Sequence, residues 1–529
     1  MKRIVSCLLA VCIMAMTSFT AFAEIPRVTE ETKEFTFWAA YNPNYQTDWE
    51  NIKAWQYFEE ATGVHVNWEL YANSGEMAEK LNVLIASGDL SSFPDAFYRC
   101  GISASQLKRY GPEGLFLDIY DLVQQYAPNL CARMDETNAW RVVLDPVTNA
   151  MYSCPDLSNS VSARMHPKLF LNTKMMQAVG VDKMPETTDE LYDLLVLIRD
   201  QDANGNGDAT DEIGITSNYA SNVIRAFTGA FGIDNRGRDD LSVDADPADE
   251  TKVRFVYTTD EYRSMLSYLN RLYEENLLDH DLFGVNTGNM IAKGSQDMIF
   301  GLSYTNIVAA GVDEADYRGL EVALKGPEGH QDWNNLSAGI GVGSFVISAS
   351  CEDPETLVKW IDSFYSEEGS LMLHFGKEGV DFTYDENGYP VYTDQVLSQV
   401  STDNPYDKVI SAITPYASGG LPRYMDDKTF CGSECRGEAL AAAQRMEPYA
   451  NEECWMFNFT TDEEEELSAL RSDLITNCHD VYQAKFITGE LDVDDDAVWN
   501  GYVAEMEGMG LEDYLYIYQT ALDRMLAVE

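Results

Sequence analysis

Between residues 35 and 98 the chain alternates between two hydrophobic periods. The segment 35–39 has the composition of a strand, and 48–61 carries apolar residues at helical spacing until Gly63 stops the helix. Residues 64–70 then alternate apolar with polar side chains, which is the period of a half-buried strand. Because this order is a βαβ unit, we expect the two strands to be parallel with a right-handed crossover.

A second helix and a third strand extend this pattern. Met77, Leu81, Leu84 and Ile85 fall on one face of a predicted helix, and a strand follows over 95–98. Repetition of strand and helix predicts a doubly wound α/β lobe at the N-terminus.

Two later parts of the chain carry further elements. A strand is predicted to start at Phe345, and a helix at Pro354. The tail from Thr461 is predicted to be helical, and its acidic run 462–466 would lie in the first turns, where the helix dipole favours negative charge.

The stretch DANGNGDATDEIG, residues 202–214, follows a predicted amphipathic helix that begins with the capping box Thr187-x-x-Glu190. Oxygen-bearing side chains alternate along it, and Gly207 occupies the sixth position, where an EF-hand loop turns sharply. Position 12 is Ile213, so the last carboxylates fall one and two places early. Hard oxygen ligands without sulfur or imidazole favour Ca²⁺, and the predicted ligands are Asp202, Asn204, Asn206, Asp208, Asp211 and Glu212. The alternative is a solvated Asn/Gly turn.

The first 23 residues have the features of a signal peptide: a basic start, an apolar run and a small-x-small end at 21–23. No cysteine stands at a lipid-attachment position, so we expect a secreted, cell-surface-associated protein without a lipid anchor. The eight cysteines after residue 23 can pair or remain buried thiols, since export permits both. Cys431 and Cys435 have no nearby histidine to complete a zinc site.

Charge and length restrict the function further. The formal charge of the whole chain is −52, and loss of Lys2 and Arg3 with the signal peptide makes the surface more acidic still. Such a surface repels nucleic acid and anionic membranes. A chain of 529 residues exceeds what one hydrophobic core organises, so two or more lobes are expected.

Four blocks of sequence carry a family resemblance: 38–70 (WAAYNPNYQTDWENIKAWQYFEEATGVHVNWEL), 81–90 (LNVLIASGDL), 170–214 (which ends in the DANGNGDATDEIG loop) and 345–382 (which begins FVISASCEDPETLVKWIDSF). In this order they resemble the extracellular solute-binding proteins of ABC importers. More narrowly, the chain is similar to the large oligosaccharide-binding type with a calcium loop, which includes alginate-oligosaccharide-binding proteins. Many Gram-positive members are lipoproteins, and this sequence departs from them in lacking an evident lipid-attachment cysteine.

The resemblance implies an α/β, two-lobed periplasmic-binding-protein-like fold, with mixed sheets flanked by helices and a ligand cleft between the lobes. Lobe one would comprise 24–160 plus 341–405, and lobe two 161–340 plus 406–529. It also implies a monomeric receptor that captures an oligosaccharide by hinge closure and delivers it to an ABC permease, with a structural Ca²⁺.

Candidate ligand residues are aromatic and planar polar side chains near predicted strand ends, since sugars offer a flat apolar face and a rim of hydroxyls. For Trp38 the alternative is a place in the hydrophobic core. For Arg164 and Glu378 the alternative is a structural salt bridge. The predicted set is Trp38, Tyr41, Asn42, Tyr98, Arg99, Arg164, Tyr304, Trp333 and Glu378.

Two other classes of function remain open at this point. A secreted glycoside hydrolase or lyase would need two positioned carboxylates, which 88 acidic residues could supply. A calcium-dependent adhesion protein would be expected to have repeats or several metal loops, and the sequence has one loop and no repeat. The motifs GxSxG, GxxxxGK[ST], GxGxxG and HExxH are absent from the sequence, and we expect a receptor rather than an enzyme.

Overall fold

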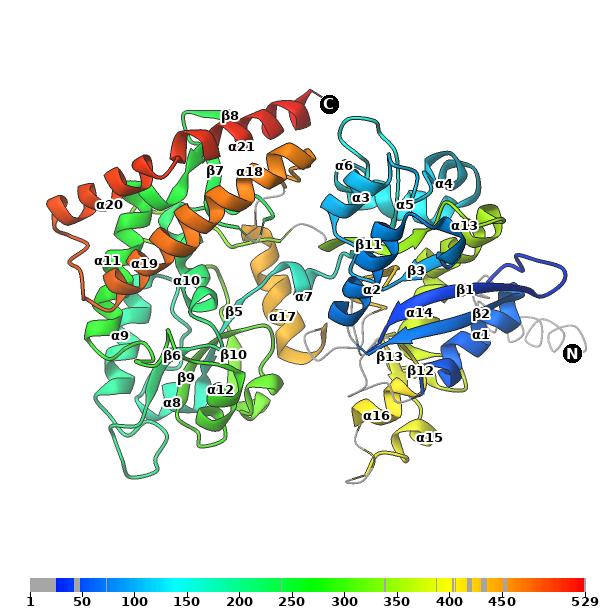
Figure 1. Ribbon diagram of the computed structural model, residues 1–529. Helices are drawn as coiled ribbons and strands as arrows, with labels where there is room; N and C mark the ends of the chain where they lie inside the picture. Colours follow the sequence, from blue (N-terminus) through cyan, green and yellow to red (C-terminus); the bar gives the residue numbers. More distant parts are fainter. Residues whose placement is uncertain are drawn as a thin grey trace, which may run out of the picture.

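The computed structural model describes residues 25–41, 48–72, 74–238, 240–336, 339–386, 388–401, 404, 406–415, 421–429, 435–450 and 454–527. Two separate mixed sheets, each flanked by helices, form two lobes that lie side by side (Figure 1). The predicted signal peptide lies outside the described residues.

Lobe one is built on a six-stranded sheet in the order β14-β4-β11-β3-β1-β2. The predicted βαβ unit is confirmed, because β1 and β2 are parallel, with Phe37 opposite Trp68, and α1 connects them. Strand β11 is antiparallel to β3 and β4, and β14 is parallel to β4. The strands are β1 (Lys33–Ala40), β2 (Val64–Tyr71), β3 (Ala96–Tyr98), β4 (Cys154–Ser158), β11 (Gly339–Ile347) and β14 (Arg423–Met425).

Both faces of this sheet are covered. Met77, Leu81 and Leu107 of α2 and α3 pack on one face, and Phe58 and Trp360 of α1 and α13 pack on the other. The helices of the lobe are α1 (Lys53–Thr62), α2 (Ser74–Ser87), α3 (Ala104–Tyr110), α4 (Tyr120–Tyr126), α5 (Pro128–Glu136), α6 (Trp140–Val143), α13 (Pro354–Asp362), α14 (Glu367–Phe375), α15 (Asp394–Leu397) and α16 (Tyr406–Ser411). A small hairpin of β12 (Phe382–Tyr384) and β13 (Pro390–Tyr392) completes it.

Lobe two is built on a four-stranded sheet in the order β10-β5-β9-β6. Its strands are β10 (Tyr317–Gly319), β5 (Lys168–Asn172), β9 (Ile299–Tyr304) and β6 (Ile213–Thr216), and a hairpin of β7 (Val243–Asp246) and β8 (Asp249–Phe255) lies beside the sheet. The helices are α8 (Thr173–Ala178), α9 (Thr188–Arg199), α10 (Ala220–Thr228), α11 (Asp260–Glu274), α12 (Thr287–Gly294), α17 (Gly437–Met446), α18 (Thr461–Arg471), α19 (Asp480–Ile487), α20 (Asp496–Gly508) and α21 (Leu511–Leu526).

The predicted helical tail is confirmed in α18 to α21. Thr460 and Glu463 form a capping box, and the acidic residues of the run lie at the start of α18. Between α18 and α19 the chain is π-helical over Ser472–His479. No helix in the described ranges is long and apolar enough to cross a membrane.

The chain passes between the lobes after β4, before β11 and after β14. The first crossing contains the short helix α7 (Val161–Arg164) between β4 and β5. One predicted boundary is corrected: segment 406–425 was expected in lobe two, but β14 at its end pairs with β4 in the sheet of lobe one. The crossing therefore comes after Met425 rather than after residue 405.

Candidate functional site

The carboxyl ends of three parallel strands form one edge of lobe one. At this edge the Tyr41 amide donates to the Tyr71 carbonyl across 2.9 Å. Arg99, which follows β3, has a left-handed backbone with φ of 56°. Its guanidinium donates to the Ala40 carbonyl across 3.0 Å. This bond holds the Arg99 guanidinium against the ends of β1 and β3, and burial lowers the pKa of Arg99.

The carboxyl ends of β6 and β9 form the corresponding edge of lobe two. Tyr304 ends β9 opposite Lys168. After β6 the chain continues through Ser217, Asn218 and Tyr219 into α10. Tyr219 is 61% exposed directly before the helix begins. An aromatic ring in this position is available for contact with a ligand.

A network of amides and hydroxyls lies behind Tyr219. The Asn222 amide group donates to Ser217 Oγ across 3.2 Å and to Asn218 Oδ1 across 3.0 Å. The Ser303 hydroxyl of β9 donates to the Asn222 carbonyl across 2.8 Å. These contacts fix the turn after β6 against β9, which positions Tyr219.

Topology makes the two edges face one another. Strand β4 runs parallel to β1 and β3, and from its carboxyl end the chain crosses directly to the start of β5. The start of β5 pairs with the carboxyl end of β9. Both sets of carboxyl ends therefore point toward the crossing segments, and open α/β sheets bind ligands at such ends.

Three predicted ligand residues lie in hydrophobic cores. Trp38 is 9% exposed and packs on Tyr71 and Phe97, with ring centroids 5.3 and 5.8 Å away. Tyr98 is fully buried among tryptophans, and Trp333 is 5% exposed. The core alternative is therefore favoured for Trp38, and Tyr98 and Trp333 are core residues as well.

The remaining predicted ligand residues lie in different parts of the molecule. Tyr41, Arg99 and Tyr304 lie at the facing strand ends. Arg164 lies in α7, where its guanidinium donates to Asn159 Oδ1 and Asn335 Oδ1, each across 3.3 Å. Glu378 is exposed elsewhere on lobe one, beside a cavity of about 540 Å³ that Arg27 and Tyr57 also line. Asn42 lies outside the described residues.

The sequence prediction missed Tyr219 and the polar groups behind it. No element was predicted over residues 213–219, whereas β6 spans Ile213–Thr216 and is followed directly by Ser217, Asn218 and Tyr219. The same signal, a short apolar strand followed by an aromatic residue, had indicated Tyr304. Applying it consistently would have identified Tyr219.

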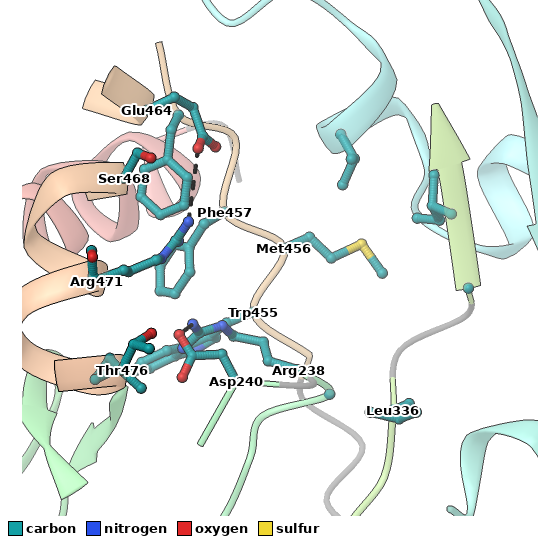
Figure 2. Close-up of a pocket in the computed structure, with 17 residues that line it drawn as sticks. Arg238, Asp240, Leu336, Trp455, Met456, Phe457, Glu464, Ser468, Arg471 and Thr476 are labelled. Atoms are coloured by element: carbon teal, nitrogen blue, oxygen red, sulfur yellow. Dashed lines mark hydrogen bonds and ion pairs between the residues drawn. The ribbon is translucent and has the colours of Figure 1, made fainter. Parts of the chain in front are cut away.

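A cavity of about 1010 Å³ also lies between the lobes (Figure 2). Val142 and Ile340 of lobe one and Arg238, Phe457 and Arg471 of lobe two line it. Its cations already have partners, since Arg238 donates to Asp240 across 3.1 Å and Arg471 to the Tyr518 hydroxyl across 2.9 Å. The Phe457 ring has Arg238 and Tyr518 within about 5 Å of its centroid.

The predicted calcium loop connects α9 to the start of β6, at the end of the lobe-two sheet away from Tyr304. Its side chains turn inward: Asp202 accepts from the Gly207 amide across 2.9 Å, and Asn206 accepts from the Asp208 amide across 2.7 Å. Glu212 accepts from the Ala203 amide across 2.7 Å through Oε1, while its buried Oε2 has no hydrogen-bond partner. A buried carboxylate oxygen without a hydrogen-bond partner is suited to contact a cation.

Side chains in the described part of the chain include no group of three or more His, Cys, Asp and Glu that could hold a metal. A cation at the 202–212 loop would therefore depend on the amide oxygens of Asn204 and Asn206 as well as on carboxylates. Five of the cysteines within the described ranges are free thiols, namely Cys100, Cys131, Cys154, Cys351 and Cys478.

Two α/β lobes, three crossings and facing strand ends define a binding protein of the two-lobed type, as expected. Residues 39–370 match the family of bacterial extracellular solute-binding proteins. The chain belongs to this family, which confirms the family predicted from the sequence.

Similarity to a curated relative extends over nearly the whole chain. The fructooligosaccharide ABC transporter substrate-binding protein FusA of Streptococcus pneumoniae is 26% identical over 518 residues, which are 94% of this chain and 91% of FusA. The structure of FusA in complex with kestose has a TM-score of 0.70 at 24% identity and covers 94% of this chain and all of FusA.

Two further solved structures share the fold. An HMO-binding, ABC-transporter-associated solute-binding protein of Bifidobacterium longum infantis has a TM-score of 0.76 at 18% identity, with 94% of this chain and 99% of that protein covered. The alginate-binding protein AlgQ2, solved without calcium ion, has a TM-score of 0.67 at 18% identity, with 95% and 100% covered.

Proposed function

We propose that this protein is the extracellular receptor of an ABC importer and that it captures an oligosaccharide between its lobes. The observation that carries the proposal is the pairing of two strand-end edges: Tyr41 and Arg99 on one lobe, Tyr219 and Tyr304 on the other. Tyrosine rings can stack on the apolar face of a sugar, and the amides and guanidinium can bind its hydroxyls. Fructooligosaccharides are the first class to test, since FusA is named for them.

Capture by closure follows because the proposed ligand-binding side chains are divided between the two lobes. A ligand that contacts both lobes stabilises the closed form, whereas one that contacts a single lobe does not shift the equilibrium. The closed form would then be recognised by the membrane permease. A monomer suffices for this, because both halves of the site belong to one chain.

The competing function is a secreted glycoside hydrolase or lyase, which would cleave what it binds. A receptor needs no general acid and releases its ligand unchanged, and the named relative FusA is a substrate-binding protein. We therefore infer that the protein is not an enzyme.

We also infer that Asp202, Asn204, Asn206, Asp208, Asp211 and Glu212 hold a structural Ca²⁺. The buried, unpartnered Oε2 of Glu212 supports this, and a calcium-free structure and an EF-hand mutant exist among similar proteins. The ion would neutralise the carboxylates that the loop brings together. Because the loop lies away from Tyr304, it would stabilise lobe two rather than contact the ligand.

Export is part of the proposal. We infer that residues 1–23 are removed as a signal peptide and that the protein acts outside the cell, as its family does. N-terminal sequencing of the secreted form would test the cleavage site.

The decisive experiment titrates the purified protein with kestose, nystose, maltotriose and an alginate trisaccharide in a calorimeter. Micromolar or tighter binding of at least one oligosaccharide is expected. Chromatography of the same mixtures after overnight incubation distinguishes the competing function. Intact sugar supports a receptor, and shortened chains would replace the proposal with the hydrolase or lyase.

A further inference from the structure

A loop of lobe two reaches across to lobe one at Asn458. The Asn458 amide group donates to two carbonyls at the carboxyl end of α6, that of Arg141 across 2.9 Å and that of Leu144 across 2.7 Å. Its Oδ1 accepts from Lys108 Nζ of α3 across 2.8 Å. We name these four residues, Lys108, Arg141, Leu144 and Asn458, the Asn458 clasp. It ties one side chain of lobe two to two helices of lobe one.

The lobe-two side of the clasp is firmly held. The Asn458 carbonyl accepts from Arg524 of α21 across 3.0 Å, and Arg524 also pairs with Glu463 at 2.7 Å. Thr460 and Glu463 form the capping box of α18. Asn458 is therefore fixed to α18 and α21, so it must move with lobe two when the lobes rotate.

The clasp lies across the crossing segments from the facing strand ends. In Figure 1, α3, α6 and α18 lie above α7, whereas the tips of β1 and β2 and the sheet of lobe two lie below it. The cavity of about 1010 Å³ lies on the side of the clasp, between α18 and the start of β11. In Figure 2, Met456 points from this loop toward lobe one, away from Phe457 and Arg471.

Rotation about a hinge narrows the gap between the lobes on one side of the hinge and widens it on the other side. Rotation about the crossing segments that brings the strand ends together moves α18 away from α3 and α6. The three hydrogen bonds of Asn458 then lengthen or break. Their polar donors and acceptors are left without a protein partner, which costs free energy. Contacts on this side therefore oppose closure of the other side.

We propose that the Asn458 clasp is a built-in brake that holds the ligand-free receptor open. The inference rests on the proposed function in one respect, namely that the ligand binds at the facing strand ends. A brake of this kind lowers the apparent affinity, because only the fraction of molecules able to close contributes to tight binding. Weakening the clasp should therefore increase affinity without any change in ligand contacts.

The test compares wild type with Asn458→Ala, which removes the three bonds of the Asn458 side chain, and with Lys108→Met, which removes the bonds of Lys108 to Asn458 Oδ1 and to the Phe459 carbonyl. Asn477→Ala is the matched control, since its amide contacts only Asp473 within the same helix, across 3.4 Å. Kestose binding is measured by calorimetry, and the radius of gyration of the free protein by X-ray scattering. Asn458→Ala should bind kestose at least threefold more tightly, with a smaller increase for Lys108→Met and none for Asn477→Ala.

Scattering keeps the test independent of the ligand. Without ligand, Asn458→Ala should have a smaller radius of gyration than wild type, because it closes more often. If wild type binds no oligosaccharide, the proposed function fails, and the scattering result alone decides on the brake. Unchanged scattering in both clasp variants, or weaker kestose binding by Asn458→Ala, would overturn it. If Asn458→Ala melts early, Lys108→Met carries the same comparison.

Discussion

Trp38 Nε1 donates a hydrogen bond of 2.8 Å to the Glu69 carboxylate on the neighbouring strand. The two residues lie opposite one another in the parallel register of β1 and β2. This bond satisfies the polar atom of a tryptophan whose ring is packed against Tyr71 and Phe97 beneath α2. Trp38 is therefore a structural residue of lobe one.

Trp38→Ala should destabilise the protein rather than selectively weaken binding. Removal of a buried tryptophan costs about 3–5 kcal/mol, and the melting temperature should fall by several degrees. Differential scanning calorimetry measures this, with Tyr219→Ala as the comparison. A variant that melts like wild type but no longer binds sugar would return Trp38 to the ligand site.

Tyr219→Ala and Tyr304→Ala should each weaken oligosaccharide binding at least tenfold, a loss of about 1.4 kcal/mol. The reason is the loss of a stacking surface at the facing strand ends. Because Tyr219 is exposed, its removal leaves no cavity, and the melting temperature should stay close to that of wild type. Isothermal titration with kestose measures the affinity.

Controls for Tyr219 separate stacking from general surface effects. Tyr219→Phe keeps the ring and should retain most of the affinity. Tyr516→Ala removes another exposed tyrosine, 71% accessible on α21, and should change nothing. Unaltered binding by both Tyr219→Ala and Tyr304→Ala would remove these strand ends from the ligand site.

Local patterns predicted the elements of the fold well. The βαβ unit and the Thr187 N-cap of α9 depend on residues close in sequence, and their periodicity or spacing is visible there. The boundary after residue 405 failed for the opposite reason. Strand β14 has only three residues and pairs with β4, more than 250 residues earlier, and no local pattern reports such a pairing.

The site was predicted only in part, because sequence gives a strand end but not the environment of its side chains. Trp38 and Tyr98 were selected for lying near strand ends, yet α2 and a cluster of tryptophans bury them. Tyr304 was selected by the same rule and does lie at the facing edge. Which side chain remains available depends on the helices packed over each face, which is a tertiary property.

Calcium removal should lower the melting temperature of the wild-type protein. At a Ca²⁺ concentration about 100 times the dissociation constant, binding stabilises the folded state by about 2.7 kcal/mol. Glu212→Gln should reduce this response most, because the buried Oε2 then no longer carries charge. Thermal unfolding with EGTA and with added Ca²⁺ measures the difference.

A matched control for the loop is Glu490→Gln, an exposed carboxylate elsewhere in lobe two. This variant should respond to chelation like wild type. Identical melting with and without EGTA in the wild-type protein would reduce the loop to a solvated turn. Atomic absorption on the dialysed protein gives a second measurement, with one Ca²⁺ per chain expected.

Acidification should destabilise the protein through two buried histidines. Burial lowers the pKa of His374 well below its ordinary value of 6.5, and nearby Arg423 lowers it further. Burial likewise lowers the pKa of His479, which stacks on Tyr257 and contacts the Tyr262 hydroxyl across 2.7 Å. Both side chains are therefore neutral in the folded state at pH values where the unfolded chain already binds a proton.

The sign follows from proton linkage. Well above pH 6.5 neither state protonates these histidines, so they add no pH dependence there. Below pH 6.5 the unfolded state binds more protons, and each histidine costs up to about 1.4 kcal/mol of stability per pH unit until its folded pKa is reached. Urea unfolding at pH 7.5, 6.5 and 5.5 should show this decline. His374→Gln should reduce the decline relative to its own stability at pH 7.5, whereas His280→Gln, at an exposed position, should not. Equal pH slopes for wild type and His374→Gln would assign the acid sensitivity to other groups.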